Sequence, residues 1–298
     1  MLTLVAILVD GLVYSSWLFV VAVGLTLIFG VMKILNVAHG SLYAFGAYLA
    51  ATLIGLYFDA GWSPLGSFVL PLVAALIVGA VLGIVLERGL LRFMYGRDEV
   101  IIVLVTYAAF LVLEDVILLV WGTDPYFAFQ PYALLGTTDI GVLSFANYDL
   151  SLILLSVVVG GLLWWGLAAT RYGKMLQAVI HDREMAQAFG INVTLVFTIT
   201  FVLGAVLGAL GGAVTAPQIS VAPGIGVEVI VVAFAVVVIG GMGSIPGAAI
   251  GALIVGLIRA AAVHLLPEVE LFVIYAVMSL VLVVRPQGLF SRAEARKI

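Results

Sequence analysis

The sequence predicts an all-α fold: a polytopic integral membrane bundle with about eight or nine transmembrane helices. Of its 298 residues, 65% are hydrophobic and only 9% are charged, and the mean hydropathy is +1.32. A soluble domain carries about 25% charged residues, with which it covers its surface. Apolar runs also recur from end to end without a long polar block. We therefore predict that residues 1–298 form a single transmembrane domain.

The apolar runs have the length of membrane helices, because a hydrocarbon core about 30 Å thick needs roughly 20 helical residues. Irregular backbone is excluded from lipid, so we expect helices joined by short turns. The expected spans are residues 10–31, 38–57, 66–88, 100–121, 151–170, 191–214, 228–243, 247–264 and 269–285. The stretch "GGMGSIPG", Gly240 to Gly247, is either a tight turn between two helices or a break within one.

Basic residues predict the orientation, because Lys and Arg concentrate in the cytoplasmic loops of membrane proteins. They gather in the loops near 88–99 and 170–190 and in the tail: Arg88, Arg92, Arg97, Arg171, Lys174, Arg183, Arg285, Arg292, Arg296 and Lys297. The loops 57–65, 122–150 and 215–227 contain none. We expect an odd number of spans, with the N-terminus outside and the C-terminus inside. The first basic residue is Lys33, so we expect no cleaved signal peptide and a retained first helix.

The composition and motifs argue against an enzyme. The net charge of -4 gives no basic patch for nucleic acid, and the absence of cysteine excludes thiolate chemistry. A phosphate loop needs Gly-Lys followed by Ser or Thr, whereas Gly173-Lys174 is followed by Met175. We find no G-x-S-x-G motif. The histidines lack metal-site spacing: His39, His181 and His264. We expect no catalytic residue, no bound cofactor and no metal.

Four charges lie within or at the ends of apolar spans: Glu114, Asp115, Glu228 and Arg259. All are expected near a membrane interface, where they have either a structural role or a role in substrate passage. No deep chain of acids or histidines suggests a proton relay, so we expect energy from outside the subunit. Small residues at helical spacing fit either ordinary bundle packing or a permeation path or subunit seam: Gly79, Gly83, Gly204, Gly208, Gly212, Gly243, Gly247 and Gly251.

The segment from Thr170 to Val193 is the most polar of its length before the tail. From Lys174 it is predicted to form an amphipathic helix on the cytoplasmic face, which Gly190 ends. Its apolar side would hold Met175, Val179 and Ala186 or Phe189, while Gln177, Asp182, Arg183 and Glu184 lie elsewhere. By periodicity alone, a solvated connector is an equally simple interpretation.

Three blocks of sequence carry a resemblance to a known family. They are "GLTLIFGVMKILNVAHGSLYAFGAYLA" from Gly24, "RYGKMLQAVIHDREMAQAFGIN" from Arg171 and "VVVIGGMGSIPGAAIGALIVG" from Val236. With their order and spacing, the chain resembles the LivH-type permeases of branched-chain amino acid ABC importers over nearly its full length. The run Glu184-Met185-Ala186 with Gly190 also resembles the E-A-A-x-x-x-G core through which such subunits engage their ATPases. Met185 replaces one alanine, and a later I-x-L-P element is absent.

The resemblance implies a transmembrane permease domain, in the cytoplasmic (inner) membrane of a prokaryote, that passes a small polar substrate inward. It implies a second related permease, two cytoplasmic ATPase subunits that use the ATP, an extracytoplasmic binding protein and surrounding lipid. Related permeases import branched-chain and other amino acids, amides or urea. The loop at about 171–190 would couple the subunit to its ATPases through Asp182, Arg183, Glu184, Met185, Ala186 and Gly190.

A polar corner, "KILNVAHG", joins the first two expected spans. Lys33 is expected at the cytoplasmic end of the first helix, where it suits the helix dipole. Asn36 is expected either to cap the next helix or, with His39 and Gly40, to line the path near an inner gate. His39 would bond its own helix end or a neighbouring helix. The candidates for the pore or gate are Asn36, His39, Gly40, Gly241, Gly243 and Pro246.

Two other functions remain open at this level. An ion-coupled secondary transporter or channel for a small polar solute would work without ATPases and would need a deep charged site. A structural membrane scaffold would tolerate changes along the cytoplasmic loop.

Overall fold

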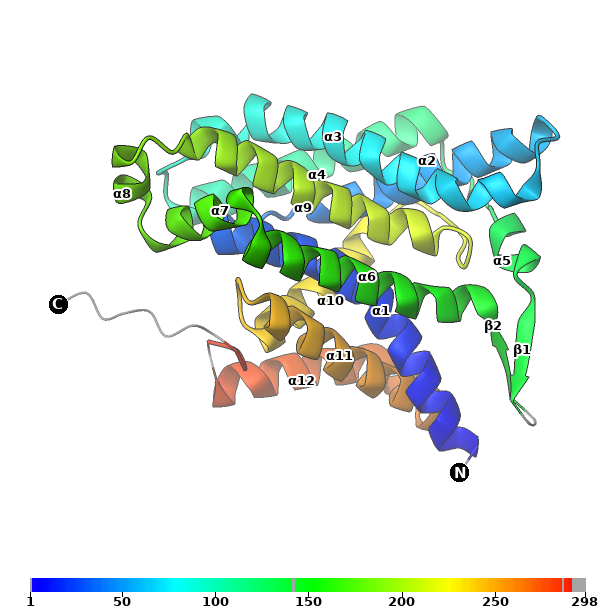
Figure 1. The fold of residues 1–298 in the computed structure, drawn as a ribbon. Helices are drawn as coiled ribbons and strands as arrows, with labels where there is room; N and C mark the ends of the chain where they lie inside the picture. The colour runs from blue at the N-terminus through cyan, green and yellow to red at the C-terminus, as the bar shows by residue number, and fades with distance from the viewer. Residues whose placement is uncertain (1, 141–142, 286, 291–298) are drawn as a thin grey trace.

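The structure, a computed structural model, describes residues 2–140, 143–285 and 287–290. Within these ranges, long apolar helices lie side by side in an elongated bundle (Figure 1). Seven of them are long and apolar enough to cross a membrane, and two shorter apolar helices complete the nine expected spans. In chain order they are α1 (Leu2–Met32), α2 (His39–Asp59), α3 (Leu70–Gly89), α4 (Glu99–Trp121), α6 (Asn147–Ala169), α9 (Val193–Thr215), α10 (Ile225–Gly240), α11 (Ile245–Leu265) and α12 (Glu270–Val284). The all-helical membrane bundle is confirmed.

Short elements connect these helices. They are the 3-10 turns η1 (Pro64–Val69), η2 (Leu91–Met94) and η3 (Pro267–Val269), the helices α5 (Gln130–Leu134), α7 (Arg171–His181) and α8 (Arg183–Ala188), and the strands β1 (Thr137–Ile140) and β2 (Leu143–Ala146). The strands pair antiparallel, with Thr137 opposite Ala146. We did not expect this hairpin. It forms outside the helical bundle, where backbone groups need not bond within a helix.

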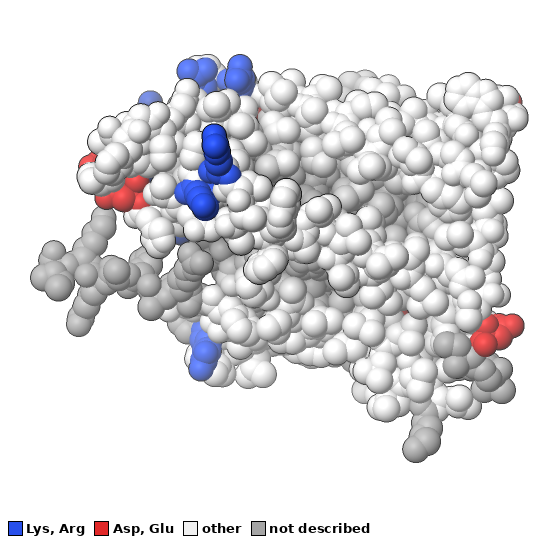
Figure 2. Space-filling model, viewed as in Figure 1, with Lys and Arg blue, Asp and Glu red and all other residues white. Residues whose placement is uncertain are grey.

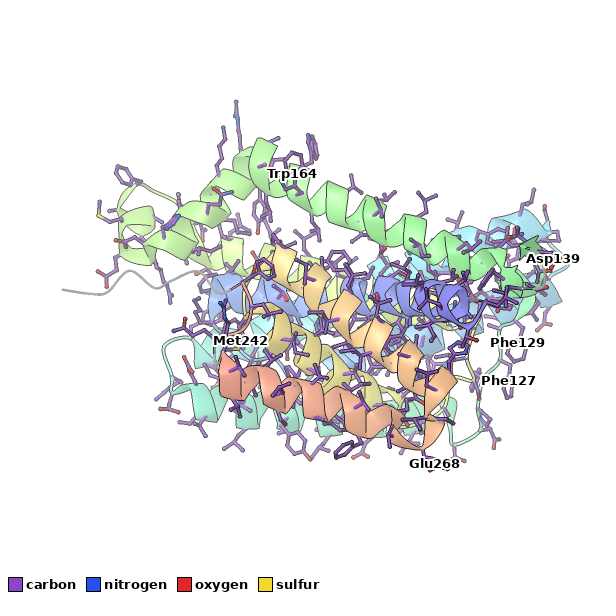
Figure 3. The ribbon with its side chains drawn as sticks, turned by 90° about the horizontal axis from the view of Figure 1, so that it is seen from below. Phe127, Phe129, Asp139, Trp164, Met242 and Glu268 are labelled. Carbon is purple, nitrogen blue, oxygen red and sulfur yellow. The ribbon has the colours of Figure 1, made fainter. Side chains whose placement is uncertain are left out.

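The two ends of the bundle differ in charge. Lys and Arg side chains gather at the end where α7 and α8 lie (Figure 2). Met242, between α10 and α11, lies toward this basic end, whereas Asp139 and Glu268 lie toward the other (Figure 3). The start of α1 and the end of α12 are at opposite ends (Figure 1), as an odd number of spans requires. Arg292, Arg296 and Lys297 fall outside the described residues.

Glycines allow the helices to pack closely. A Cβ on Gly79 of α3 would overlap the backbone of Val206 in α9, and one on Gly212 of α9 would overlap the carbonyl oxygen of Tyr43 in α2. Hydrophobic association does not drive helices together in lipid, so close van der Waals packing has to do so. Ordinary bundle packing is therefore confirmed at these crossings, with α9 and α1 at the centre and α4 and α6 at the periphery.

The stretch Gly240–Gly247 is a tight turn between two helices. Gly241 and Gly243 have φ angles of 103° and 84°, in the left-handed region that favours glycine. Ser244 then caps α11, because its hydroxyl oxygen accepts a hydrogen bond from the Gly247 amide at 3.1 Å. A Cβ on Gly240 would overlap the backbone of Gly247. The chain therefore reverses here, and α10 and α11 form an antiparallel pair.

Helix α2 begins deep inside the bundle rather than at its surface. The chain leaves α1 at Lys33, whose φ of 56° ends the helix as predicted, and residues 33–38 return into the bundle without a helix or strand. His39 then bonds the carbonyl oxygen of Val21. Val21 lies about 18 Å along α1 from Lys33 and about 16 Å from Asp10. The start of α2 is therefore close to the middle of the bundle.

Helix α10 also begins inside the bundle. Residues 216–224 enter from the other end, where Val221 forms an isolated antiparallel bridge with Tyr126, and the helix starts after Gly224, with a φ of 88°. Gly226 in its first turn lies against Gly40 of α2 so closely that a Cβ on Gly40 would overlap the Gly226 carbonyl oxygen. The N-termini of α2 and α10 therefore meet near the middle of the bundle, and the two helices run to opposite ends.

We expect Gly40→Val to lower stability by about 3 kcal/mol, because the added side chain meets backbone that cannot move aside. Gly55→Val is the matched control, since nothing lies within 4 Å of a Cβ at that position of the same helix. The temperature at which half of the purified protein loses monodispersity in detergent measures the effect. A value for Gly40→Val equal to that of Gly55→Val would contradict the close contact.

Candidate functional site

His39 ties the start of α2 to α1 and α9. Its side chain is fully buried, and Nε2 lies 3.0 Å from the carbonyl oxygen of Val21. Because a carbonyl only accepts, Nε2 donates its hydrogen, which leaves Nδ1 as an acceptor without a partner among the described residues. A Cβ on Gly208 of α9 would lie 2.8 Å from the ring. The expected bond from His39 to a neighbouring helix is confirmed.

Asn36 does not cap α2, so that expectation is wrong. The N-cap is Ala38, without a side-chain hydrogen bond, and the His39 amide bonds the backbone oxygen of Asn36 at 3.3 Å. Asn36 is itself buried, and its Nδ2 has no partner among the described residues. The chain makes a turn before α2. In this turn a backbone carbonyl oxygen, and not a side chain, accepts the hydrogen bond from the first amide of the helix.

Thr106 of α4 holds the irregular segment in place. Its hydroxyl oxygen accepts a hydrogen bond from the Val37 amide at 3.2 Å, and its hydroxyl lies 3.3 Å from the Leu35 carbonyl oxygen. Irregular backbone is tolerated at membrane depth only where protein satisfies its polar groups. Sequence reasoning missed Thr106, although a polar residue within an apolar span was an available signal.

Glu114 of α4 lies at the start of α10. The N-cap of α10 is Gly224, which has no side chain of its own to offer. A Cβ on Gly226 would lie 2.7 Å from Oε1 of Glu114. A negative charge stabilises the positive end of a helix dipole. Glu114 therefore lies at the positive end of α10, inside the bundle and not at the interface where we expected it.

The turn between α10 and α11 forms a second packed cluster, separate from the first. Gly30 of α1 lies against Gly243, about 14 Å along α1 from Val21. The amides of Leu289 and Phe290 bond the carbonyl oxygens of Ile239 and Gly240 at 2.9 and 3.0 Å, which caps the end of α10. The gate candidates thus fall into two groups: Asn36, His39 and Gly40 at the middle, and Gly241, Gly243 and Pro246 toward the basic end.

The predicted cytoplasmic helix is two helices, which corrects the expectation of one helix from Lys174 to Gly190. The break is at Asp182, whose Oδ1 accepts a hydrogen bond from the Met185 amide at 2.9 Å and so caps α8. Asp favours this capping geometry over the helix interior. Gly190, with a φ of 81°, ends α8 as predicted, and the Ile191 amide bonds the Ala186 carbonyl oxygen.

The side chains of α8 project from the bundle. Ala186 is buried, as expected, but Phe189 is 81% exposed and Met185 52% exposed. On α7 the buried residues include Leu176 and Val179, whereas Met175 is exposed, contrary to our expectation. Asp182, Arg183 and Glu184 are all exposed. The result is a small surface, charged and apolar at once, at the basic end of the molecule.

A buried acid lies beneath this surface. Glu87 of α3 is fully buried and accepts hydrogen bonds from the Tyr95 hydroxyl at 2.5 Å and the Thr198 hydroxyl at 2.8 Å. Burial raises the pKa of Tyr95, and the hydrogen bond and charge of Glu87 raise it further. The Arg183 guanidinium lies 5.1 Å from the centre of the Phe197 ring in α9. Together these contacts link α8 to α3 and α9.

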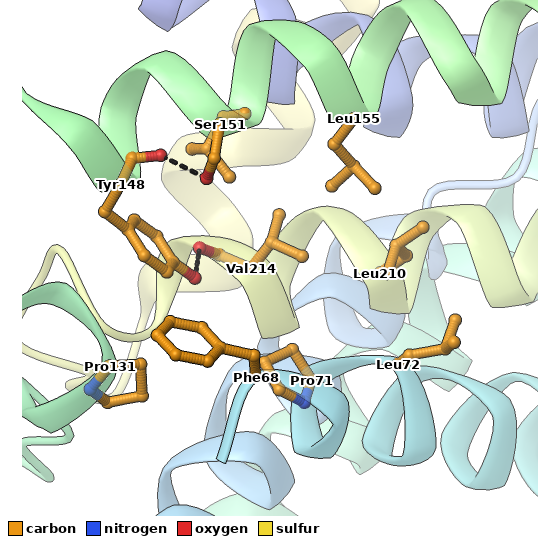
Figure 4. Close-up of a pocket in the computed structure, with 10 residues that line it drawn as sticks. Phe68, Pro71, Leu72, Pro131, Tyr148, Ser151, Leu155, Leu210 and Val214 are labelled. Atoms are coloured by element: carbon orange, nitrogen blue, oxygen red, sulfur yellow. Dashed lines mark hydrogen bonds between the residues drawn. The ribbon is translucent and has the colours of Figure 1, made fainter. Parts of the chain in front are cut away.

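At least three cavities flank α6, of which the smallest, about 270 Å³, lies between α1, α6, α7 and α9. Two are larger. One of about 480 Å³ lies between α1, α6, α7 and the α10–α11 turn, and its lining includes Thr26, Gln177, Gly243 and Pro246. The other, of about 300 Å³, lies between α3, α6 and α9 (Figure 4). In the second, the hydroxyls of Tyr148 and Ser151 donate to backbone carbonyls, so its wall is largely apolar. The described residues hold no cluster of three or more potential metal ligands.

Known proteins are similar in sequence to this chain over nearly its whole length. Residues 7–282 match the family described as branched-chain amino acid transport system / permease component. The chain is 31% identical to the high-affinity branched-chain amino acid transport system permease protein BraD of Pseudomonas aeruginosa, over 98% of this chain and 97% of that protein. It is 28% identical to LivH of Escherichia coli, over 97% and 96%.

An archaeal protein is similar as well. The probable branched-chain amino acid transport permease protein LivH of Methanocaldococcus jannaschii is 30% identical over 84% of this chain and 78% of that protein. No solved structure matches the chain. Because the family match covers nearly all of the bundle described above, from α1 to α12, this chain belongs to the branched-chain amino acid transport system permease family.

Proposed function

We propose that this protein is the membrane-spanning permease subunit of an ABC importer. It passes branched-chain or related amino acids from an extracytoplasmic binding protein into the cytoplasm, and partner ATPases drive the transport. Its relatives are described as branched-chain amino acid transport permeases, which supports this substrate class. The observation that carries the proposal is the α7–α8 element, which presents exposed charged and apolar side chains at the basic end of the bundle.

The basic end is proposed to be cytoplasmic. Arg88, Arg92, Arg171 and Lys174 lie in or beside the elements at this end, and such residues favour the cytoplasmic side of short loops. The C-terminus is then inside and the start of α1 outside. The β1–β2 hairpin, which lies at the opposite end (Figure 1), belongs to the outer face, where the binding protein delivers its substrate.

The α7–α8 element is proposed to transmit the movement of the ATPases. Asp182 and Gly190 fix the two ends of α8, while Arg183, Glu184 and Met185 present exposed side chains. Ala186 anchors the element to the bundle by its buried side chain. A force on α8 reaches α9 directly, because the Arg183 guanidinium lies on the Phe197 ring and α9 starts after Gly190.

Two joints are proposed to change with that movement. One is the middle cluster of Asn36, His39 and Gly40, and the other is the turn that contains Gly241, Gly243 and Pro246. The cavity of about 480 Å³ places Gln177 of α7 across from Gly243 and Pro246. Displacement of α7 into this space would press on the turn. Such a displacement is a rigid-body shift of the kind that switches packed helices between two arrangements.

ATP is proposed to bind only to partner subunits, since the chain lacks a phosphate-loop sequence. The assembly consists of this chain, a second related permease, two cytoplasmic ATPases and the binding protein. No cofactor is expected on this chain.

Reconstitution tests the function. Proteoliposomes that contain this chain, its partner permease and the ATPases should accumulate radiolabelled leucine only with ATP inside and binding protein outside. Omission of either should reduce uptake to the level of empty liposomes, because the bundle has no energy source of its own. Uptake by this chain alone, driven by an ion gradient, would overturn the proposal in favour of a secondary transporter.

The docking role of α8 gives a second test. Phe189→Ser should weaken binding of the detergent-solubilised permease to its ATPases about tenfold or more, since burial of an exposed Phe side chain contributes about 1.5–3 kcal/mol. Leu65→Ser is the matched control: Leu65 is 77% exposed, close to the 81% of Phe189, but lies in η1. Affinity is read by co-purification at graded ATPase concentrations. Equal losses in both variants would remove α8 from the docking site.

A further inference from the structure

Glu228 is a charged side chain exposed on the outside of the bundle. It lies one turn into α10, in a stripe of that helix which other described helices leave uncovered. The same stripe contains Val231, which is also exposed, and Phe234, which is partly exposed. The stripe therefore combines one carboxylate with apolar side chains.

The depth of Glu228 makes its exposure unusual. Gly226, two residues earlier, packs on Gly40, and Gly40 follows His39, which bonds Val21. Val21 is about 18 Å from Lys33 and about 16 Å from Asp10 along α1. From this level α10 runs further toward the basic end. Glu228 is therefore near the middle of the bundle, whereas its position at the start of a predicted span had suggested an interface.

No ion pair among the described residues includes Glu228. The ion pairs there are Arg259 with Glu270 and His264 with Asp10. An ionised carboxylate that faces lipid at this depth costs several kcal/mol, and such residues instead face protein or water. The exposed side of α10 is thus unsuited to lipid in the assembled transporter.

The outer face of α6 provides the contrast. Its exposed residues include Leu154, Val157 and Trp164, and Trp164 projects away from the bundle (Figure 3). From Leu150 to Ala169 the helix carries no charged residue. Such a surface fits the acyl chains of lipid. The outer face of α6 is therefore apolar, whereas the exposed stripe of α10 carries a carboxylate.

We infer that the exposed stripe of α10 with Glu228 faces the second permease subunit across a water-filled translocation path. This inference rests on the proposed function, which supplies the partner and the path. It assigns the α10 face, rather than the α6 face, to the seam between the subunits. Water in the path solvates the Glu228 carboxylate, and the partner shields this side of α10 from lipid.

The absence of cysteine makes the assignment testable with single introduced thiols. In the assembled importer in proteoliposomes, E228C and V231C should react with the charged, membrane-impermeant reagent MTSET at least about tenfold faster than V157C on α6, since only a hydrated thiol ionises readily. V231C retains Glu228 and lies one turn further along the stripe, so the test survives if E228C fails to fold.

Cross-linking then identifies the partner. V231C coupled to a benzophenone maleimide should yield, on illumination, a covalent product that contains both permease subunits, and V157C treated in the same way should not. If E228C and V231C react with MTSET no faster than V157C, or if V231C fails to cross-link to the second permease, the assignment is wrong. Wild-type uptake is measured in the same vesicles, and only its independence of ATP would contradict the proposed function.

Discussion

Backbone groups inside a lipid bilayer must find their partners within the protein, and this constraint governs the centre of the bundle. Two helices, α2 and α10, begin near the middle, where backbone turns before each helix bond its first amides. The two starts pack together through Gly40 and Gly226, and the Glu114 carboxyl of α4 lies beside them. Thr106, also on α4, satisfies the irregular segment that leads to α2. Thr106, a polar residue in an apolar span, is thus explained by the backbone groups that it satisfies.

The same arrangement separates rigid parts from parts that are free to move. At the middle and at the α10–α11 turn, glycine contacts leave no space for a side chain, so these joints shift as units and do not deform continuously. Helix α8, by contrast, is held mainly by Ala186 and by Arg183 on Phe197. The cavity of about 480 Å³ between α7 and the turn is a loosely filled space between these two regions. A signal from the basic end would therefore travel through helix displacement.

Sequence patterns predicted some elements correctly because their causes are local. The α10–α11 turn follows from glycines that accept positive φ and a Ser that caps the next helix. Gly190 ends α8 for the same reason. Other outcomes depend on contacts that the sequence does not show. Asn36 has the chemistry of a cap, but the backbone turn before α2 bonds the His39 amide instead. Glu87 lies in an apolar span, where it accepts hydrogen bonds from Tyr95 and Thr198. The coupling and gating roles remain predictions.

The sequence by itself determined that the chain crosses a membrane, roughly where each helix lies, which end is basic and to which family the chain belongs. These properties depend on composition, run length and motif order, all of which are local in the chain. Only the tertiary structure decided how deep α2 and α10 begin, and hence that Glu228 is exposed near the middle of the bundle and not at its edge. Depth depends on which helices lie side by side, and hydropathy records how apolar a segment is without recording how far the chain folds back.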